Sequence, residues 1–132
     1  MDSIKDLIPK DKFDNSAYEQ LMALSDDEIT PIIPELLKWI QDMNWPVAPS
    51  VIKVLASHRT ATEKHLSVLL KPEQKDDEWK RNIIKYLLSE WHSYPDDERI
   101  TAEIKRIAEN PTDGEREELV DEAAQELLNV FA

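Results

Sequence analysis

Clusters of acidic side chains are the residues of this sequence that could most readily carry chemistry. Three triplets occur, Asp26-Asp27-Glu28, Asp76-Asp77-Glu78 and Asp96-Asp97-Glu98. Paired carboxylates can bind a hard cation or transfer protons. Each triplet falls in or just before the expected first turn of a helix, where carboxylates accept hydrogen bonds from free N–H groups and favour the positive end of the helix dipole. We therefore interpret the triplets as residues that start helices.

Histidine, cysteine and glycine usage disfavours most cofactor chemistry. The three histidines, His58, His65 and His92, lack the i, i+4 spacing of a helical zinc site, and the chain has no cysteine to supply thiolate ligands. A single glycine, Gly114, is too few for a P-loop or a dinucleotide fingerprint. We expect no metal site, no cofactor and no nucleotide-dependent catalysis, and we name no catalytic residue.

A turn near the middle of the chain combines polar side chains with an aromatic one. Asp42, Asn44 and Trp45 lie between two expected helices. They could form a recognition patch, because aromatic residues carry much of the binding energy in interfaces. They could equally be structural, with Asn44 capping the next helix, Asp42 satisfying N–H groups of the turn and Trp45 filling the space between helices. Both interpretations stay open.

The segment from Pro111 onward is strongly acidic. Seven acids against one arginine give it a net charge of −6, half of the total of −12. Like charges four residues apart destabilise a helix unless cations lie nearby. The segment could therefore be a ridge for a basic partner, or a solvated face whose charges are met by other helices. The candidate binding residues here are Glu118, Asp121, Glu122 and Glu126.

The overall charge and hydropathy restrict the class of partner and the location. With 16 basic and 28 acidic residues, the chain should repel phosphate backbones, so we expect no nucleic acid. No apolar run is long enough for a bilayer, and the N-terminus lacks the features of a secretory signal, so we expect no membrane association. The lack of cysteine is typical of a reducing compartment. We therefore expect a soluble, cytoplasmic protein.

The elements that would position these residues are all helical. Apolar residues recur at steps of three and four, and no segment alternates like a strand. The pattern predicts an all-α fold of about seven helices in one domain, residues 1–132, with an irregular lead-in over 1–13. Capping boxes are expected at Ser25–Glu28 and Thr60–Glu63, a cap at Thr30, and Pro46 in a first helical turn. The expected antiparallel helix pairs cover about 31–57, 61–91 and 96–131, and their members are roughly 31–43 with 46–57, 61–70 with 77–91, and 96–109 with 114–131.

The helix pairs also suggest an internal repeat. The acidic turn followed by a valine-rich helix is similar to a HEAT repeat, although Trp45 and Trp79 lie only 34 residues apart, against about 40 to 47 for HEAT units. Two segments, IPKDK at 8–12 and WIQDMNWPVA at 39–48, resemble the signatures of a small bacterial domain-of-unknown-function family. The resemblance implies a compact, HEAT-like helical domain of the bacterial cytoplasm, stacked as a short α-α array. It implies no established activity and no catalytic residues.

Three hypotheses of function follow. The first is a non-catalytic protein-interaction module, in one form an acidic inhibitor or immunity-type protein that covers the basic site of its partner. The alternative is a small-ligand-binding protein or enzyme whose pocket is assembled only in the fold, from residues such as Asp42, Asn44 and the histidines. The third is a structural homo-oligomer in which Trp39, Trp45 or Trp91 forms an exposed apolar patch. The oligomeric state does not follow from the sequence.

Overall fold

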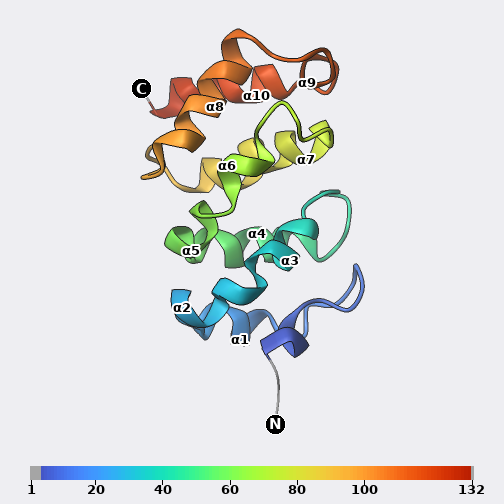
Figure 1. Cartoon of the computed structure of the whole chain (residues 1–132). Helices are drawn as coiled ribbons and strands as arrows, with labels where there is room; N and C mark the ends of the chain where they lie inside the picture. Colours follow the sequence, from blue (N-terminus) through green and yellow to red (C-terminus); the bar gives the residue numbers. More distant parts are fainter. Residues whose placement is uncertain (1–3, 132) are drawn as a thin grey trace. The chain divides into compact units, whose positions relative to one another are not determined.

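The computed structural model describes residues 4–131 and is all-helical over that range, with no strand, which confirms the predicted fold class (Figure 1). The chain divides into two compact units, Met1–Thr62 and Glu63–Ala132. The single domain over 1–132 stays a prediction. No helix within residues 4–131 combines the length and the apolar character needed to cross a membrane.

The first unit is built around one longer helix. Helix α4 lies beside both α1 and α3 and buries Val51, Val54 and Leu55. The other apolar side chains that build this core come from the preceding helices, among them Ile29 and Leu36. The elements are η1 (Ile4–Leu7), α1 (Tyr18–Ala23), α2 (Asp26–Ile29), η2 (Thr30–Ile32), α3 (Ile33–Lys38), α4 (Ala48–Ser57) and, at the boundary of the units, α5 (Arg59–Glu63).

The start of α2 is the predicted capping box. The Ser25 hydroxyl accepts a hydrogen bond from Glu28 N at 3.1 Å, and the Glu28 carboxylate accepts one from Ser25 N at 2.8 Å. The chain then passes through η2, because Pro31 and Pro34 lack the N–H groups that a continuous helix would need. The predicted cap at Thr30 is wrong: this residue starts η2, and its hydroxyl donates to Asp26 O at 2.6 Å.

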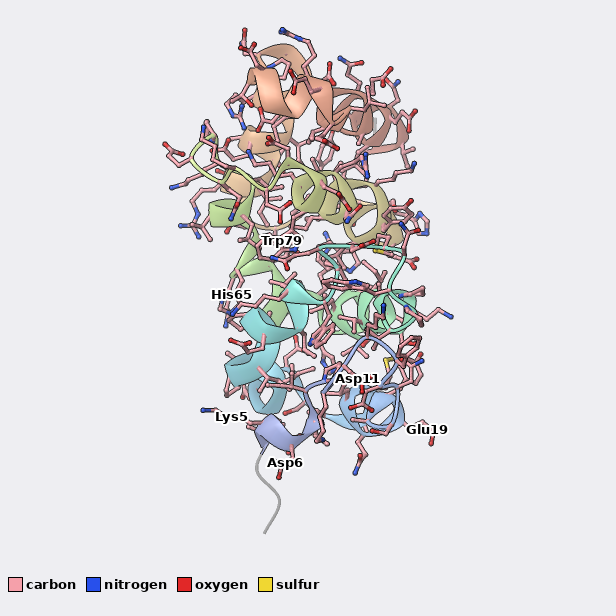
Figure 2. The ribbon with its side chains drawn as sticks, turned by 90° about the vertical axis from the view of Figure 1, so that its right-hand side faces the viewer. Lys5, Asp6, Asp11, Glu19, His65 and Trp79 are labelled. Carbon is pink, nitrogen blue, oxygen red and sulfur yellow. The ribbon has the colours of Figure 1, made fainter. Side chains whose placement is uncertain are left out.

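The turn before α4 is longer than predicted. Helix α3 ends at Lys38 and α4 begins at Ala48 with Pro49 in its first turn, so the assignment of Pro46 to that turn is wrong. Val47 N instead donates to the carbonyl of Lys12 at 2.9 Å, which fastens the lead-in to this turn. Residues 1–3 of the predicted lead-in lie outside the described residues, and its described part contains only the short η1. Figure 2 shows Asp6 of η1 and Glu19 of α1 pointing outward.

The second unit packs its C-terminal helix against two others. Helix α10 lies along α8 and along the run formed by α7 and η3 (Figure 1). Together with η4, that run matches the predicted helix over 77–91. Its hydrogen bonding changes from α in α7 to π in η3 and then to 3-10 in η4. Asp76 and Asp97 cap α7 and α8, as expected of the acidic triplets. The elements are α6 (Leu66–Leu69), α7 (Asp77–Asn82), η3 (Ile83–Leu87), η4 (Leu88–Glu90), α8 (Glu98–Glu109), α9 (Asp113–Glu117) and α10 (Val120–Phe131).

Two predicted helices are broken, so the helices are shorter and more numerous than expected. The helix predicted over 61–70 is split into α5 and α6, and Thr60 lies inside α5, so the predicted capping box there is wrong. Its other members bond elsewhere: the Thr62 hydroxyl donates to Leu55 O at 2.9 Å, and the Glu63 carboxylate accepts from Asp97 N at 3.0 Å. The helix predicted over 114–131 breaks at Leu119 into α9 and α10.

Candidate functional site

The central turn of the first unit is held by Asp42. Its carboxylate accepts a hydrogen bond from Asn44 N at 2.8 Å, and its carbonyl accepts one from Trp45 N at 3.2 Å. This confirms the structural role expected of Asp42. The expected capping role of Asn44 is wrong, because the residue before α4 is Val47, which makes no side-chain cap, and Asn44 is exposed. The turn is therefore held by hydrogen bonds among its own residues.

The two tryptophans of this unit form a half-buried pair. The rings of Trp39 and Trp45 meet edge to face, with centroids 5.6 Å apart and an interplanar angle of 66°. They line a shallow groove of about 230 Å³ with Glu35, Lys38 and Gln41. Glu35 and Lys38 are ion-paired with each other at 3.2 Å. Part of the surface of each ring is thus used for packing on the other, and both side chains stay partly exposed.

His58 is a buried structural residue. Its side chain is only 5% exposed, with Nδ1 2.9 Å from the Asp26 carboxylate and Nε2 2.9 Å from the carbonyl of Leu21. The two ring nitrogens thus face hydrogen-bond acceptors on two different helices. The ring thereby joins α1, α2 and the end of α4 in the first unit.

The other sequence candidates for a pocket are dispersed. His92 is exposed, Trp91 is buried and therefore cannot belong to an exposed patch, and burial followed by the charge of Lys64 lowers the pKa of His65. Four grooves on the described residues each contain at most one of Asp42, Asn44, the histidines and the tyrosines. Within residues 4–131, no three acidic or histidine side chains converge in a way that could hold a metal ion.

The predicted acidic residues of the second unit lie in and just before α10. Glu118, Glu122 and Glu126 are exposed, and Asp121 is half-buried with a buried Oδ1 that makes no hydrogen bond. Arg81 pairs with Glu118 at 3.6 Å. Among the residues that the structure describes, Asp121, Glu122 and Glu126 have no salt bridge. Because the helix breaks at residue 119, only Glu122 and Glu126 keep the like-charge i, i+4 spacing within one helix.

A groove runs beside these acids, between α10 and the α7–η3 run. Two adjoining hollows of about 370 and 110 Å³ share Lys85, Ala123 and Glu126, and together they form what we call the α10 groove. One wall carries Arg81, Ile84, Lys85, Tyr86 and Ser89, and the other carries Leu119, Glu122, Ala123, Glu126, Leu127 and Val130. The larger hollow is therefore lined by charged and apolar side chains alike, and the smaller one mainly by apolar side chains.

Three apolar residues that line the α10 groove are exposed, whereas Ile84, Ala123 and Leu127 are buried. Tyr86 is 38% exposed, Leu119 53% and Val130 63%. Leu119 also has a φ of 61°, the left-handed region that glycine and asparagine tolerate best. The break between α9 and α10 turns the Leu119 side chain out to the groove. Strain of this kind is concentrated at functional sites.

A buried ion cluster lies in the same unit. Lys80 and Glu115 are both 0% exposed, with Nζ 2.7 Å from Oε2, and Arg106 donates to both Glu115 oxygens at 2.9 and 2.8 Å. Burial raises the pKa of Glu115, but the hydrogen bonds from Arg106 and Lys80 outweigh it and hold the pKa at about 2. Hydrogen bonds to Glu115 and Glu103 raise the pKa of Arg106. The cluster is fully paired, so its role is to join α7, α8 and α9.

Sequence reasoning missed this cluster and most of the α10 groove. From the sequence, Glu115 is an acid in the first turn of a helix and nothing more. In the structure it is the capping-box partner of Thr112 and also pairs with Lys80, 35 residues earlier. The available signal for the groove was the spacing of Arg81 and Lys85 at i, i+4 next to Tyr86, on a helix with apolar residues on more than one face.

Comparison with known proteins places the chain in a family. No curated protein matches the sequence significantly. A family model described as Domain of unknown function (DUF5071) matches residues 7–128, nearly the whole chain. The match agrees with the resemblance to a domain-of-unknown-function family that the sequence suggested. The chain therefore belongs to this family of unknown function, DUF5071.

Proposed function

We propose that this protein is a non-catalytic protein-interaction module whose acidic α10 surface binds a basic partner protein. The single observation that carries the proposal is the pair Glu122 and Glu126. Both carboxylates are exposed, repel each other within one helix, and have no salt bridge among residues 4–131. A basic partner would supply the missing cations, and the net charge of −12 would steer it to the surface.

The neighbouring acids support the same surface. Asp121 adds a buried carboxylate oxygen without a hydrogen bond, which a donor from a partner or from water would satisfy. Glu118 is already held by Arg81, at 3.6 Å and with partial exposure of both side chains, so this contact is weak and exchangeable. Binding of a basic protein would gain from all four candidate acids without first breaking a strong ion pair.

Finer features belong to the same proposal. We propose a HEAT-like stacking of the helix pairs, a cytoplasmic location in a bacterium, and an inhibitor or immunity-type role in which the module covers a basic site of its partner. The turn with Asp42, Asn44 and Trp45 is a second candidate surface, supported by the partly exposed tryptophan pair. An experimental structure of the complex tests the stacking and the role, and cell fractionation tests the location.

The experiment compares two triple variants with the same charge change. Glu118→Gln/Glu122→Gln/Glu126→Gln neutralises the α10 surface, and a control variant neutralises three other exposed acids of the same unit, Glu73, Glu90 and Glu109. Each variant carries three charges fewer, −9 instead of −12. Purified proteins serve as bait in lysate of the source organism at low and moderate salt, and each captured basic protein is then purified and tested for direct binding.

We expect a basic protein to bind the wild type and the control variant, and to lose about tenfold or more in affinity for the α10 variant. Equal binding to both triple variants would contradict the proposal. A partner of acidic character, or capture that is unaffected by salt, would contradict it as well.

A further inference from the structure

The α10 groove has features that identify the kind of segment it can hold. Both of its walls are helical, so their backbone N–H and C=O groups are already paired within the helices. An extended strand would find no free edge to join, because the described residues contain no strand. A polyproline segment needs an aromatic-lined groove, and Tyr86 is the aromatic residue among those lining this one. A helix satisfies its own backbone and needs only side-chain contacts.

The exposed apolar residues match the length of such a helix. Leu119 directly precedes α10 and Val130 lies near its end, about 15 Å away along the helix at about 1.5 Å per residue. The small side chain of Ala123 lies between them and allows close approach. A partner helix of three turns with apolar residues at i, i+4, i+7 and i+11 would cover Leu119, Tyr86 and Val130 together.

The charges of the walls define the flanks of that helix. On the α10 side, Glu122 and Glu126 have no salt bridge among the described residues. On the opposite wall, Arg81 is engaged by Glu118, and Lys85 lies 5.5 Å from the ring centroid of its neighbour Tyr86. The unpaired charge of the groove is thus mainly negative. A second copy of this chain, itself at −12, fits this groove poorly on charge.

From these observations we infer that the α10 groove binds an amphipathic helix of the partner, with an apolar stripe and Lys or Arg along one flank. The inference rests on the proposed function and names the chemistry of its partner. Leu119 adopts a left-handed conformation that glycine or asparagine would occupy with less strain. A leucine at this position supports a role for its exposed side chain in this contact.

The probes are two synthetic peptides of about 18 residues and identical composition. One has leucines at i, i+4, i+7 and i+11 with lysines and arginines on one flank, and the other has the same residues distributed around the helix. The full-length chain is titrated into each fluorescently labelled peptide, and the dissociation constant is read from anisotropy. We expect the striped peptide to bind about tenfold or more tightly than the redistributed one.

Three variants separate the contributions of the groove. Val130→Ser should weaken binding of the striped peptide about fivefold or more, whereas Val68→Ser, at an equally exposed valine outside the groove, should leave it unchanged. Leu119→Asn should weaken binding while the melting temperature stays the same or rises, because asparagine tolerates the left-handed conformation. Such a gain or constancy in stability excludes misfolding as the cause.

The outcomes distinguish this inference from the proposed function. Equal affinity for both peptides, together with weaker binding of both peptides to Glu122→Gln/Glu126→Gln, would overturn the helix inference and keep the acidic interaction surface. Unchanged affinity of the striped peptide for Glu122→Gln/Glu126→Gln would overturn both the helix inference and the proposed function. Absence of saturable binding of the striped peptide, or self-association of the chain that Val130→Ser abolishes, would also overturn the inference.

Discussion

Neutralising Glu115 should destabilise the protein more than most single substitutions. In the wild type, Oε2 of Glu115 lies 2.7 Å from Lys80 Nζ, and Arg106 donates to both carboxylate oxygens. Removing one partner of a buried ion pair costs about 3–5 kcal/mol, because the other charge stays buried. Asp77, 3.5 Å from Lys80, and Glu103, 2.8 Å from Arg106, compensate in part. We therefore expect Glu115→Gln to cost about 3 kcal/mol, the lower end of that range.

The glutamine variant isolates the charge from the helix cap. Glutamine can replace glutamate as the third residue of a capping box, so the hydrogen bond from Thr112 N to position 115 can persist. The assay is urea denaturation of the wild type, Glu115→Gln, Lys80→Met and the double variant. The double variant should lose less than the sum of the two single losses, with a coupling of more than about 1 kcal/mol.

Additive losses would refute the reasoning, because the two side chains would then contribute independently despite their contact. A loss below about 1 kcal/mol for Glu115→Gln would refute it too, since that is the range of exposed ion pairs.

Three further predictions concern pH, the single glycine and His58. The pKa of Glu115 is about 2 in the folded protein and near 4.5 in the unfolded chain, so the stabilisation by its carboxylate is complete above about pH 4.5 and is lost as the pH falls toward 2. The melting temperature of the wild type should drop toward that of Glu115→Gln over this range. A constant difference between the two melting temperatures across this pH range would be inconsistent with this. A Cβ at Gly114 would collide with the Asp77 carboxylate, so Gly114→Ala should lower the free energy of unfolding in the wild type but raise it, by about 1 kcal/mol, in an Asp77→Ala background. Urea denaturation measures both changes, and the same sign in both backgrounds would argue against the collision. His58→Gln should cost roughly 1–3 kcal/mol by removing the contact to Asp26, with faster amide exchange in α1 and α2; unchanged exchange there would show that the ring does not join these helices.

The sequence predicted those parts of the fold that depend on neighbouring residues. The capping box at Ser25 and the caps at Asp76 and Asp97 form as expected, because each needs only a polar side chain and an N–H two or three residues later. Periodicity also gave the helix over 77–91 and the all-α class. The sequence also resembled a domain-of-unknown-function family, and the family model confirms membership in such a family.

The parts that could not be predicted depend on contacts between distant residues. Thr62 and Glu63 bond to Leu55 and Asp97 rather than forming a cap, and nothing near them in the sequence indicates this. The break at Leu119 follows no proline or glycine, so the helical pattern continues across it. The candidate acids were identified from charge alone, whereas the groove beside them requires two helices that are distant in the sequence to lie together.

The most direct test of the central claim is the salt dependence of the affinity for the captured basic partner. The dissociation constant is measured by calorimetry for the wild type and for the two triple variants, over a range of salt concentrations. If the α10 surface binds the partner, the variant at Glu118, Glu122 and Glu126 shows weaker binding and a shallower salt dependence, while the control variant follows the wild type. The same affinity and the same slope for all three proteins would contradict the claim that this acidic surface is the binding site.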